Sequence, residues 1–143
     1  MSVFDDVRDF HKALEVPIEV HPTIPDEKRV MLRLDLIMEE FTETLSAIES
    51  DNIIEIADGL VDLLYVVIGT MHEFGLPAQD LWDEVHRTNM AKAGGPVRDD
   101  GKRLKPEGWV PPDIRRVLLK TAVACPRCKG KRLNAGEACP WHP

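Results

Sequence analysis

Hydrophobic residues recur at helical spacing along most of this chain of 143 residues. Over residues 26–49 they return at every third or fourth position, which predicts a long amphipathic helix. These positions are Val30, Leu34, Met38, Phe41, Leu45 and Ile48. Residues 53–74 are almost wholly apolar until Gly75 and Pro77 end the run, and such a helix is expected in the middle of a bundle.

Shorter helices are predicted on both sides of these two. Ser2 and Asp5 have the spacing of a helix start, and Pro17 limits the length of this first helix. Residues 78–91 form a further amphipathic segment that ends before a Gly-Gly-Pro sequence. Its expected inner face consists of Leu81, Trp82, Val85 and Met90.

A long connection follows that helix. Residues 97–110 contain two glycines, a proline and many charges, which indicates a loop too long for an ordinary connection and therefore a functional candidate. Asp113, preceded by two prolines, is expected to start a last helix that runs to about Val123. No alternating pattern is long enough to argue for a sheet, so the predicted fold class is all-α.

Length and composition allow one domain with an appendage. We assign residues 1–120 to a helical domain and residues 121–143 to the appendage. No stretch approaches the roughly 20 apolar residues of a membrane span, and the N-terminus is acidic, unlike a signal peptide. We therefore expect a cytoplasmic protein with no membrane partner.

Charge is unevenly distributed along the chain. The formal net charge is -7, but residues 1–91 carry six basic and twenty acidic side chains, whereas residues 92–132 carry twelve basic and four acidic ones. The first part suits cations and the second suits phosphates. Single charge clusters are more often solvated surface, yet two opposed regions in one chain favour a functional division.

Two acidic stripes fall on the two long helices. The first stripe consists of Glu39, Glu40 and Glu43, and the second of Glu55, Asp58 and Asp62. The short turn between the helices makes them antiparallel neighbours, so the stripes can meet. Carboxylates gathered in this way repel one another unless divalent cations neutralise them, and Mg²⁺ prefers such oxygens. A solvent-facing glutamate stripe is the alternative for the first set, and it is less convincing for the second.

The two motifs resemble a known signature. Glu39-Glu40-Phe41-Thr42-Glu43 followed by Glu55-Ile56-Ala57-Asp58 is similar to the signature of MazG-like all-α nucleoside triphosphate pyrophosphohydrolases, which are related to dimeric dUTPases and phosphoribosyl-ATP pyrophosphohydrolases. Residues 86–114 also resemble the tail of bacterial and phage members. The resemblance covers about residues 5–118. It implies a helical bundle that cleaves nucleotides with Mg²⁺ or Mn²⁺ in a bacterial cell or phage-infected host.

The resemblance also implies residue roles. Glu40, Glu43, Glu55 and Asp58 correspond to the Mg²⁺ ligands, and Glu39 to the residue that holds or deprotonates the attacking water. The reaction is hydrolysis between the α and β phosphates, which releases a nucleoside monophosphate and pyrophosphate. Metal ions suit this chemistry because they screen phosphate charge and lower the pKa of a water molecule.

Further residues are candidates for substrate binding. The resemblance points to Asn89 and Lys92, whose amide and ammonium groups can bind a sugar, base or phosphate. Asp62 and Tyr65 either reach the sugar or a second metal, or serve as a supporting acid and a half-buried core tyrosine. Arg98 and Lys105 lie, with Lys102 and Arg103, on the long loop, which could close over phosphates. For each of these basic residues alone, a solvated surface position remains the stronger alternative.

The appendage contains a separate metal motif. Its four candidate ligands are Cys125, Cys128, Cys139 and His142. Two pairs with two-residue spacing predict a structural, tetrahedral Zn²⁺ site, because four protein ligands fill the coordination sphere. This zinc knuckle lies outside the MazG-like resemblance.

Substrate and partners are left open by the sequence. A dUTP-like or other deoxynucleotide is the first expectation, a dGTP or GTP pyrophosphohydrolase that supports modified-base DNA is an alternative, and phosphoribosyl-ATP is less favoured. A nucleic-acid-binding module is the alternative from another class, but it leaves the acidic stripes unexplained. The apolar surface of the long helices favours a homodimer or homotetramer.

Overall fold

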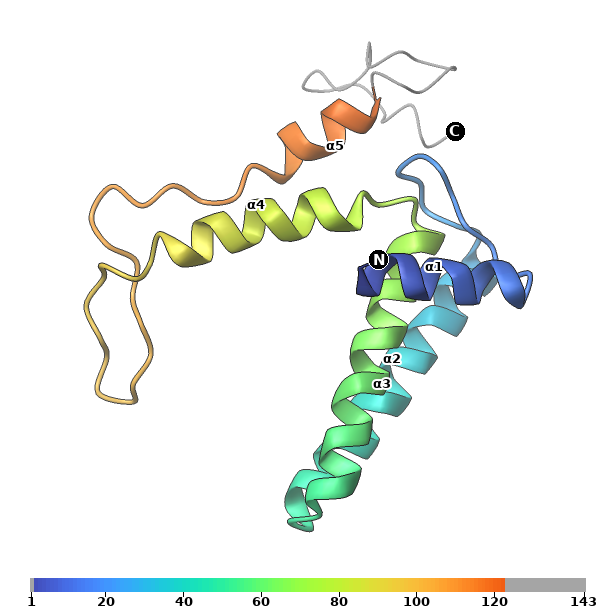
Figure 1. Ribbon diagram of the computed structural model, residues 1–143, viewed down its shortest axis with the longest axis horizontal. Helices are drawn as coiled ribbons and strands as arrows, with labels where there is room; N and C mark the ends of the chain where they lie inside the picture. Colours follow the sequence, from blue (N-terminus) through green and yellow to red (C-terminus); the bar gives the residue numbers. More distant parts are fainter. Residues whose placement is uncertain (1, 123–143) are drawn as a thin grey trace.

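The computed structural model describes residues 2–122 and shows a helical protein (Figure 1). Over these residues the helices are α1 (Val3–Ala13), α2 (Glu27–Glu49), α3 (Ile53–Glu73), α4 (Ala78–Met90) and α5 (Ile114–Ala122). Within the described range, β-type pairing is confined to an isolated antiparallel bridge between Val97 and Arg103. The predicted all-α fold class is confirmed.

Local capping explains where the helices begin. The Ser2 hydroxyl accepts a hydrogen bond from the Asp5 backbone N–H, and the Asp5 carboxylate accepts one from the Ser2 N–H at 3.0 Å. Asp26 caps α2 by accepting from the Arg29 N–H at 3.0 Å, and Asn52 caps α3 in the same way. These side chains satisfy backbone donors that have no partner within the helix.

The two long helices form an antiparallel hairpin, and α3 also contacts α1 and α4 (Figure 1). The turn between them needs a residue in the left-handed region, which Asp51 supplies with φ 53°. Gly75 ends the α3 segment with φ 62°, and a Cβ there would lie 2.0 Å from the His21 carbonyl oxygen. As expected, α3 contacts three helices, but its apolar residues Leu60, Val61 and Leu64 are exposed, so the described residues do not enclose it in a bundle.

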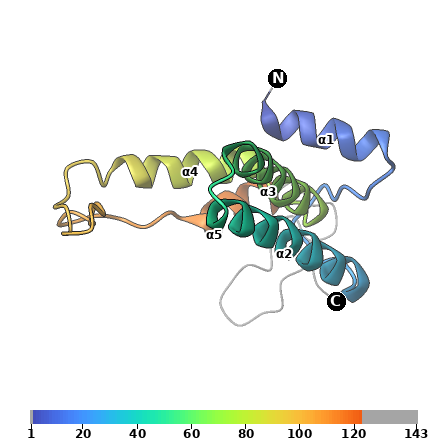
Figure 2. The ribbon, with the colours of Figure 1, turned by 90° about the horizontal axis from the view of Figure 1, so that it is seen from below.

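The core lies where α1 crosses the C-terminal half of α3. Phe4 and Val7 of α1 pack with Ile68 of α3 and with Ala78 at the start of α4. Figure 2 shows α1 lying to one side of the hairpin. This small core fixes one end of the hairpin, and the end with the α2–α3 turn projects beyond it (Figure 1).

Two histidines are buried at the same junction. His11 and His72 are each 3% exposed, and their ring centroids lie 6.1 Å apart. One ring nitrogen of His72 lies 2.8 Å from the Phe4 carbonyl oxygen. Burial lowers the pKa of both imidazoles below the usual 6.5, because it disfavours the charged form.

A buried ionic network joins α2 to the end of α3. The Glu73 carboxylate, 1% exposed, lies 2.6 Å from an Arg29 guanidinium nitrogen and 3.2 Å from an Arg33 nitrogen. Arg33 also donates to the Val66 carbonyl oxygen at 2.6 Å and to the Thr70 hydroxyl at 3.0 Å. Burial lowers the pKa of Arg33, whereas the Glu73 charge acts in the opposite direction. The negative charge of Glu73 therefore compensates the buried positive charge of Arg33.

The structure corrects the predicted inner face of α4. Leu81 is buried, but Trp82 is 57% exposed and Met90 is 60% exposed, and Val85 is also exposed. The exposure of these residues follows from the direction of α4, which lies near α3 only at the first turn of α4 and then projects away from the hairpin (Figures 1 and 2). The outer turns of α4 instead bury Glu84 and Thr88, which face α5 and the chain that leads to it.

The apolar stripe of α2 also faces outward. α2 buries Arg33, Thr44 and Ala47, which lie on a different side of the helix from the predicted stripe. The exposed positions of the stripe are Leu34, Met38, Phe41, Leu45 and Ile48. Helical periodicity identified the apolar face correctly, but the chain's own α3 does not cover that face.

None of the helices over residues 2–122 has the length and apolarity needed to cross a membrane.

Candidate active site

Close packing of α2 on α3 sets the position of the acidic residues. An ideal Cβ at Gly59 would lie 2.6 Å from the Thr44 hydroxyl oxygen and 3.3 Å from the Thr44 Cα. The Thr44 hydroxyl donates to the Glu40 carbonyl oxygen one turn earlier, at 2.7 Å. Because only a hydrogen atom fits at Gly59, the two backbones approach closely beside the predicted ligands.

The predicted carboxylates gather around Glu40. Glu40 is half-buried, whereas its acidic neighbours are exposed. These neighbours are Asp62, Glu43, Glu39 and Asp58. Burial raises the pKa of Glu40, and the negative charges of those neighbours raise it further. The two stripes therefore meet as expected, but they do so at the molecular surface and not in the interior.

Glu55 lies at the edge of this cluster, in the first turn of α3. It shares with Glu43 an open hollow of about 340 Å³ near the α2–α3 turn. The remaining lining residues are Thr42, Ser46, Ala47 and Ser50. Each of the three hydroxyl groups donates to a backbone carbonyl of α2, so its free lone pairs make the hollow rich in acceptors.

A ready-made protein cage for a metal is absent from residues 2–122, because no three Asp, Glu, His or Cys side chains converge on one point there. Mg²⁺ does not require such a cage, since it commonly binds through one or two carboxylates, several waters and substrate phosphates. The donor set fits this mode of binding: the carboxylates are exposed and close enough to raise the pKa of Glu40.

The other two candidates on α3 have different surroundings. Asp62 belongs to the group around Glu40. Tyr65 is half-buried and packs against the core, with its ring 5.3 Å from the Phe10 ring in an edge-to-face arrangement. Asp62 is thus available to a ligand at the acidic cluster, whereas the Tyr65 ring serves the α1–α3 contact.

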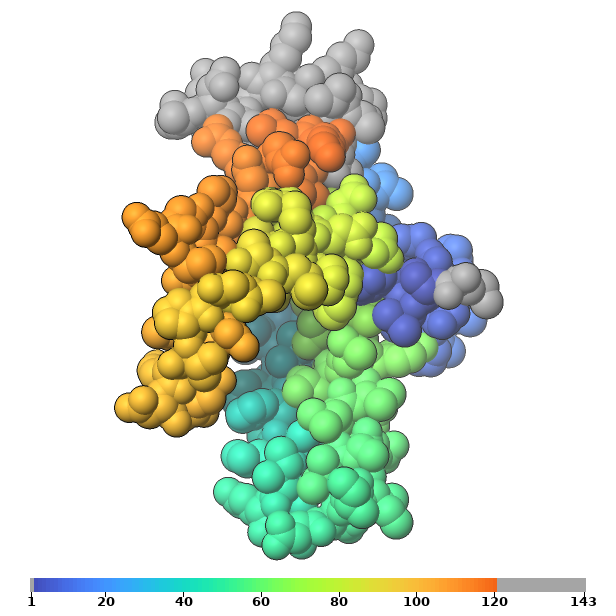
Figure 3. Space-filling view, turned by 60° about the vertical axis from the view of Figure 1, so that its left-hand side comes forward, coloured from blue at the N-terminus to red at the C-terminus, as the bar shows by residue number. Residues whose placement is uncertain are grey.

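The basic candidates lie on a separate arm formed by the end of α4 and the following loop. Lys92 donates to the Asn89 side-chain oxygen at 2.7 Å. Arg98 is paired with Asp100 on the same loop, its Nε lying 2.9 Å from a carboxylate oxygen. Lys105 lies on the loop's return path. Figures 1 and 2 show α4 leading this arm away from the α2–α3 hairpin, and Figure 3 shows the arm (yellow to orange) and the hairpin (teal to green) in space-filling form.

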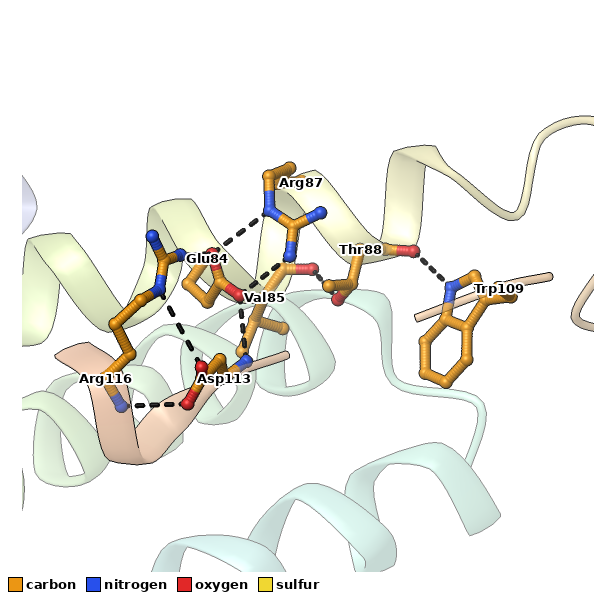
Figure 4. Close-up of polar contacts among 7 residues, drawn as sticks. All are labelled: Glu84, Val85, Arg87, Thr88, Trp109, Asp113 and Arg116. Carbon is orange, nitrogen blue, oxygen red and sulfur yellow. Dashed lines mark hydrogen bonds and ion pairs between the residues drawn. The ribbon is translucent and has the colours of Figure 1, made fainter. Parts of the chain in front are cut away.

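Sequence reasoning missed the contacts that hold this arm. Glu84, 6% exposed, accepts hydrogen bonds from Arg87, from the Asp113 backbone N–H at 2.8 Å and from Arg116 at 3.0 Å (Figure 4). The Arg87 and Asp113 hydrogen bonds, in that order, lower the pKa of Glu84 to about 2. These hydrogen bonds of Glu84 attach the start of α5 to α4. An acid in a surface helix gives no sequence signal for partners about thirty residues away.

The predicted zinc ligands lie outside the described residues. They are Cys125, Cys128, Cys139 and His142. The proposed boundary at residue 120 falls within α5, so the zinc motif and the domain division remain predictions.

Comparison with known proteins identifies the family. The fold and the site define an all-α protein with a cluster of carboxylates on an antiparallel pair of helices. The phosphoribosyl-ATP pyrophosphohydrolase family profile matches residues 7–89, which include α2, α3 and all of the carboxylate candidates. The chain belongs to this family of pyrophosphohydrolases.

A viral protein also shares a segment with the chain. An uncharacterized protein of Acanthamoeba polyphaga mimivirus is 49% identical over 47 residues. The matched segment covers 33% of this chain and 19% of the viral protein. This similarity is local, and because the viral protein is uncharacterized it assigns no activity.

Proposed function

We propose that the protein hydrolyses a nucleoside triphosphate between the α and β phosphates, with Mg²⁺, to a monophosphate and pyrophosphate. The observation that carries the proposal is the crowding of carboxylates around Glu40, whose raised pKa reflects burial and four acidic neighbours. Such repulsion is relieved when a divalent cation binds. Family membership supports the same class of reaction.

In this proposal, Glu40, Glu43, Glu55 and Asp58 hold the metal. Mg²⁺, or Mn²⁺ in its place, would supply charge neutralisation at the phosphates and a lower pKa for a bound water. Glu39 is one residue before Glu40 and carries an exposed carboxylate, so it can accept a proton from water beside the cluster. Asp62 lies close enough to Glu40 to orient the sugar or to assist the metal.

The arm supplies positive charge for the phosphates when it, or the arm of a second copy, is brought to the acidic cluster, because α4 leads it away from the α2–α3 hairpin of its own chain. Asn89 and Lys92 are joined by a hydrogen bond, and Lys105 lies near them through their common neighbour Trp109. Arg98 contributes once its pairing with Asp100 is exchanged for phosphate, because both partners are exposed and an exposed pair costs little to break. Tyr65 is the weakest of the substrate candidates because its ring packs against Phe10.

A deoxynucleotide such as dUTP is the first substrate that we propose, and dGTP or GTP is an alternative. The match to the phosphoribosyl-ATP pyrophosphohydrolase family favours phosphoribosyl-ATP as a second candidate. The same phosphoanhydride bond is broken in each case. The proposed site of action is the cytoplasm of a bacterial cell or a phage-infected host.

A second copy of the chain is the proposed partner for the exposed face of α2. Leu34, Met38, Phe41, Leu45 and Ile48 alternate at spacings of four and three residues and are each about half exposed. This is the spacing of a coiled-coil seam, and a stripe of this length is rarely left to solvent. A homodimer or homotetramer built on α2 would cover it. Nucleic acid remains the alternative partner, and the structural zinc knuckle is a further proposed element.

A substrate screen tests the proposed function. The purified protein is incubated with Mg²⁺ and each common nucleoside triphosphate, deoxynucleoside triphosphate or phosphoribosyl-ATP, and the products are separated by ion-exchange chromatography. We expect monophosphate and pyrophosphate from one or two nucleotides, or loss of pyrophosphate from phosphoribosyl-ATP. The double variant Glu40→Gln, Asp58→Asn is expected to abolish either product. Turnover of none of these substrates with Mg²⁺ or Mn²⁺ would overturn the proposal.

A further inference from the structure

The long loop between α4 and α5 has an ordered internal structure. Val97 and Arg103 form an antiparallel bridge, and the Leu104 N–H donates to the Pro96 carbonyl oxygen at 2.7 Å. A Cβ at Gly95 would lie 2.0 Å from the Leu104 carbonyl oxygen, so glycine permits the two sides to approach. The loop is therefore a closed hairpin whose base returns the chain toward α4.

Trp109 fixes this return path to α4. Its indole N–H donates to the Thr88 carbonyl oxygen at 2.8 Å (Figure 4). Carbonyl groups in the last turn of a helix have no donor within the helix, and the Lys92 N–H bonds to Asn89 instead. The indole thus satisfies a helix-end carbonyl group, and this hydrogen bond restricts the orientation of the ring.

Two lysines meet at that ring. The ammonium nitrogen of Lys105 lies 4.2 Å from the centroid of the indole, and that of Lys92 lies 5.4 Å from it. Both distances are within the range of cation–π attraction. The ion pairs found over residues 2–122 include neither lysine, although they include Arg98 and Arg116 on either side. Trp109 therefore gathers two positive charges without neutralising them.

We propose that Trp109 is a positioning residue, which holds Lys92 and Lys105 together as one receptor for a polyphosphate chain. The inference rests on the proposed function for its biological ligand, but the receptor itself is defined by the arm alone. An aromatic ring can restrain flexible lysines and leave their positive charge available, whereas a carboxylate partner would neutralise that charge. The restraint lowers the conformational entropy that the lysines lose when the anion binds.

The alternative role is a loop anchor with no effect on charge. Two substitutions separate the roles, because Trp109→Phe removes the N–H but keeps an aromatic face, and Trp109→Leu removes both. A simple anchor would also leave Lys105→Ala independent of Trp109. If Trp109 acts through Lys105, the effects of the two substitutions are coupled and do not add.

Calorimetric titration with inorganic tripolyphosphate, without divalent cations, measures the receptor directly. We expect Trp109→Leu to weaken binding about tenfold and Trp109→Phe to have a smaller effect. Lys105→Ala should weaken binding in the wild-type background but have little further effect in Trp109→Leu. Lys28→Ala is the matched control, since it removes the same charge from an exposed lysine on α2, outside the arm. Thermal unfolding confirms that each variant is folded.

Unchanged tripolyphosphate affinity in folded Trp109→Leu, or additive effects of Trp109→Leu and Lys105→Ala, would overturn the proposal. Failure of the wild-type protein to bind tripolyphosphate would also overturn it. If Trp109→Leu does not fold, Trp109→Phe and its cycle with Lys105→Ala decide the matter. The result is independent of the proposed hydrolysis, because a protein that binds tripolyphosphate but cleaves no nucleotide would support the receptor and contradict only the enzyme.

Discussion

Replacement of Glu73 by glutamine is expected to destabilise the α2–α3 hairpin severely while leaving its shape unchanged. Glu73 is 1% exposed and compensates two arginines, of which Arg33 is 8% exposed at its side chain. A guanidinium that is buried without its partner costs about 3–5 kcal/mol. Glutamine keeps an oxygen that can accept one hydrogen bond, so we expect the lower end, about 3 kcal/mol. For a chain of this size this corresponds to a fall in Tm of roughly 10 °C.

The assay is urea unfolding monitored by circular dichroism, with Asp9→Asn as the matched control. Asp9 pairs with Lys12 at 2.8 Å on α1, and both side chains are 60% exposed. Exposed pairs of this kind contribute about 0–1 kcal/mol, so the control should scarcely change the free energy of unfolding. Equal effects of Glu73→Gln and Asp9→Asn would refute the view that burial makes the Glu73 network essential.

Three further predictions concern the same hairpin. Gly59→Ala should lower the free energy of unfolding by about 1–2 kcal/mol, because overpacking against Thr44 outweighs the gain in helix propensity. Denaturant unfolding of the double variant with Thr44→Ala should show most of this free energy restored. The free energy of unfolding should fall as the pH drops through 6.5, because unfolded His11 and His72 bind protons there whereas their folded pKa values are lowered; a profile unchanged in His11→Gln would contradict this. Glu40→Gln should raise the Tm of the metal-free protein at neutral pH, because the raised pKa of Glu40 means that its charge opposes folding above pH 4.5. The same substitution should reduce the further rise in Tm that Mg²⁺ produces.

The helices were predictable because their signals are local. Ser2, Asp26 and Asn52 bind the N–H groups of the first turns that follow them, and Gly75 ends α3, so the boundaries follow from neighbouring residues. The acidic cluster was predictable for a related reason. A short turn makes two helices antiparallel neighbours, and helical periodicity then determines which carboxylates can face each other around Glu40.

The remaining features depend on partners that are distant in the sequence. Periodicity marked Leu34 and Phe41 as part of an apolar face, but it could not indicate that α3 would cover a different side of α2. Glu73 lies 44 residues from Arg29, and nothing local announces their pairing. The same is true of Trp109, whose contacts with Thr88 and two lysines have no local signal in the sequence. The direction of α4, and with it the separation of the basic arm from the acidic cluster, follows from tertiary packing.

Phosphorus NMR of the reaction with Mg²⁺ and a triphosphate that the protein turns over tests most directly whether the carboxylate cluster cleaves the α–β bond. We predict nucleoside monophosphate and pyrophosphate as the first products, and no reaction in the Glu40→Gln variant when that variant is shown to be folded. Nucleoside diphosphate and orthophosphate as the first products, or undiminished turnover by Glu40→Gln, would contradict cleavage at the α–β bond by the carboxylate cluster.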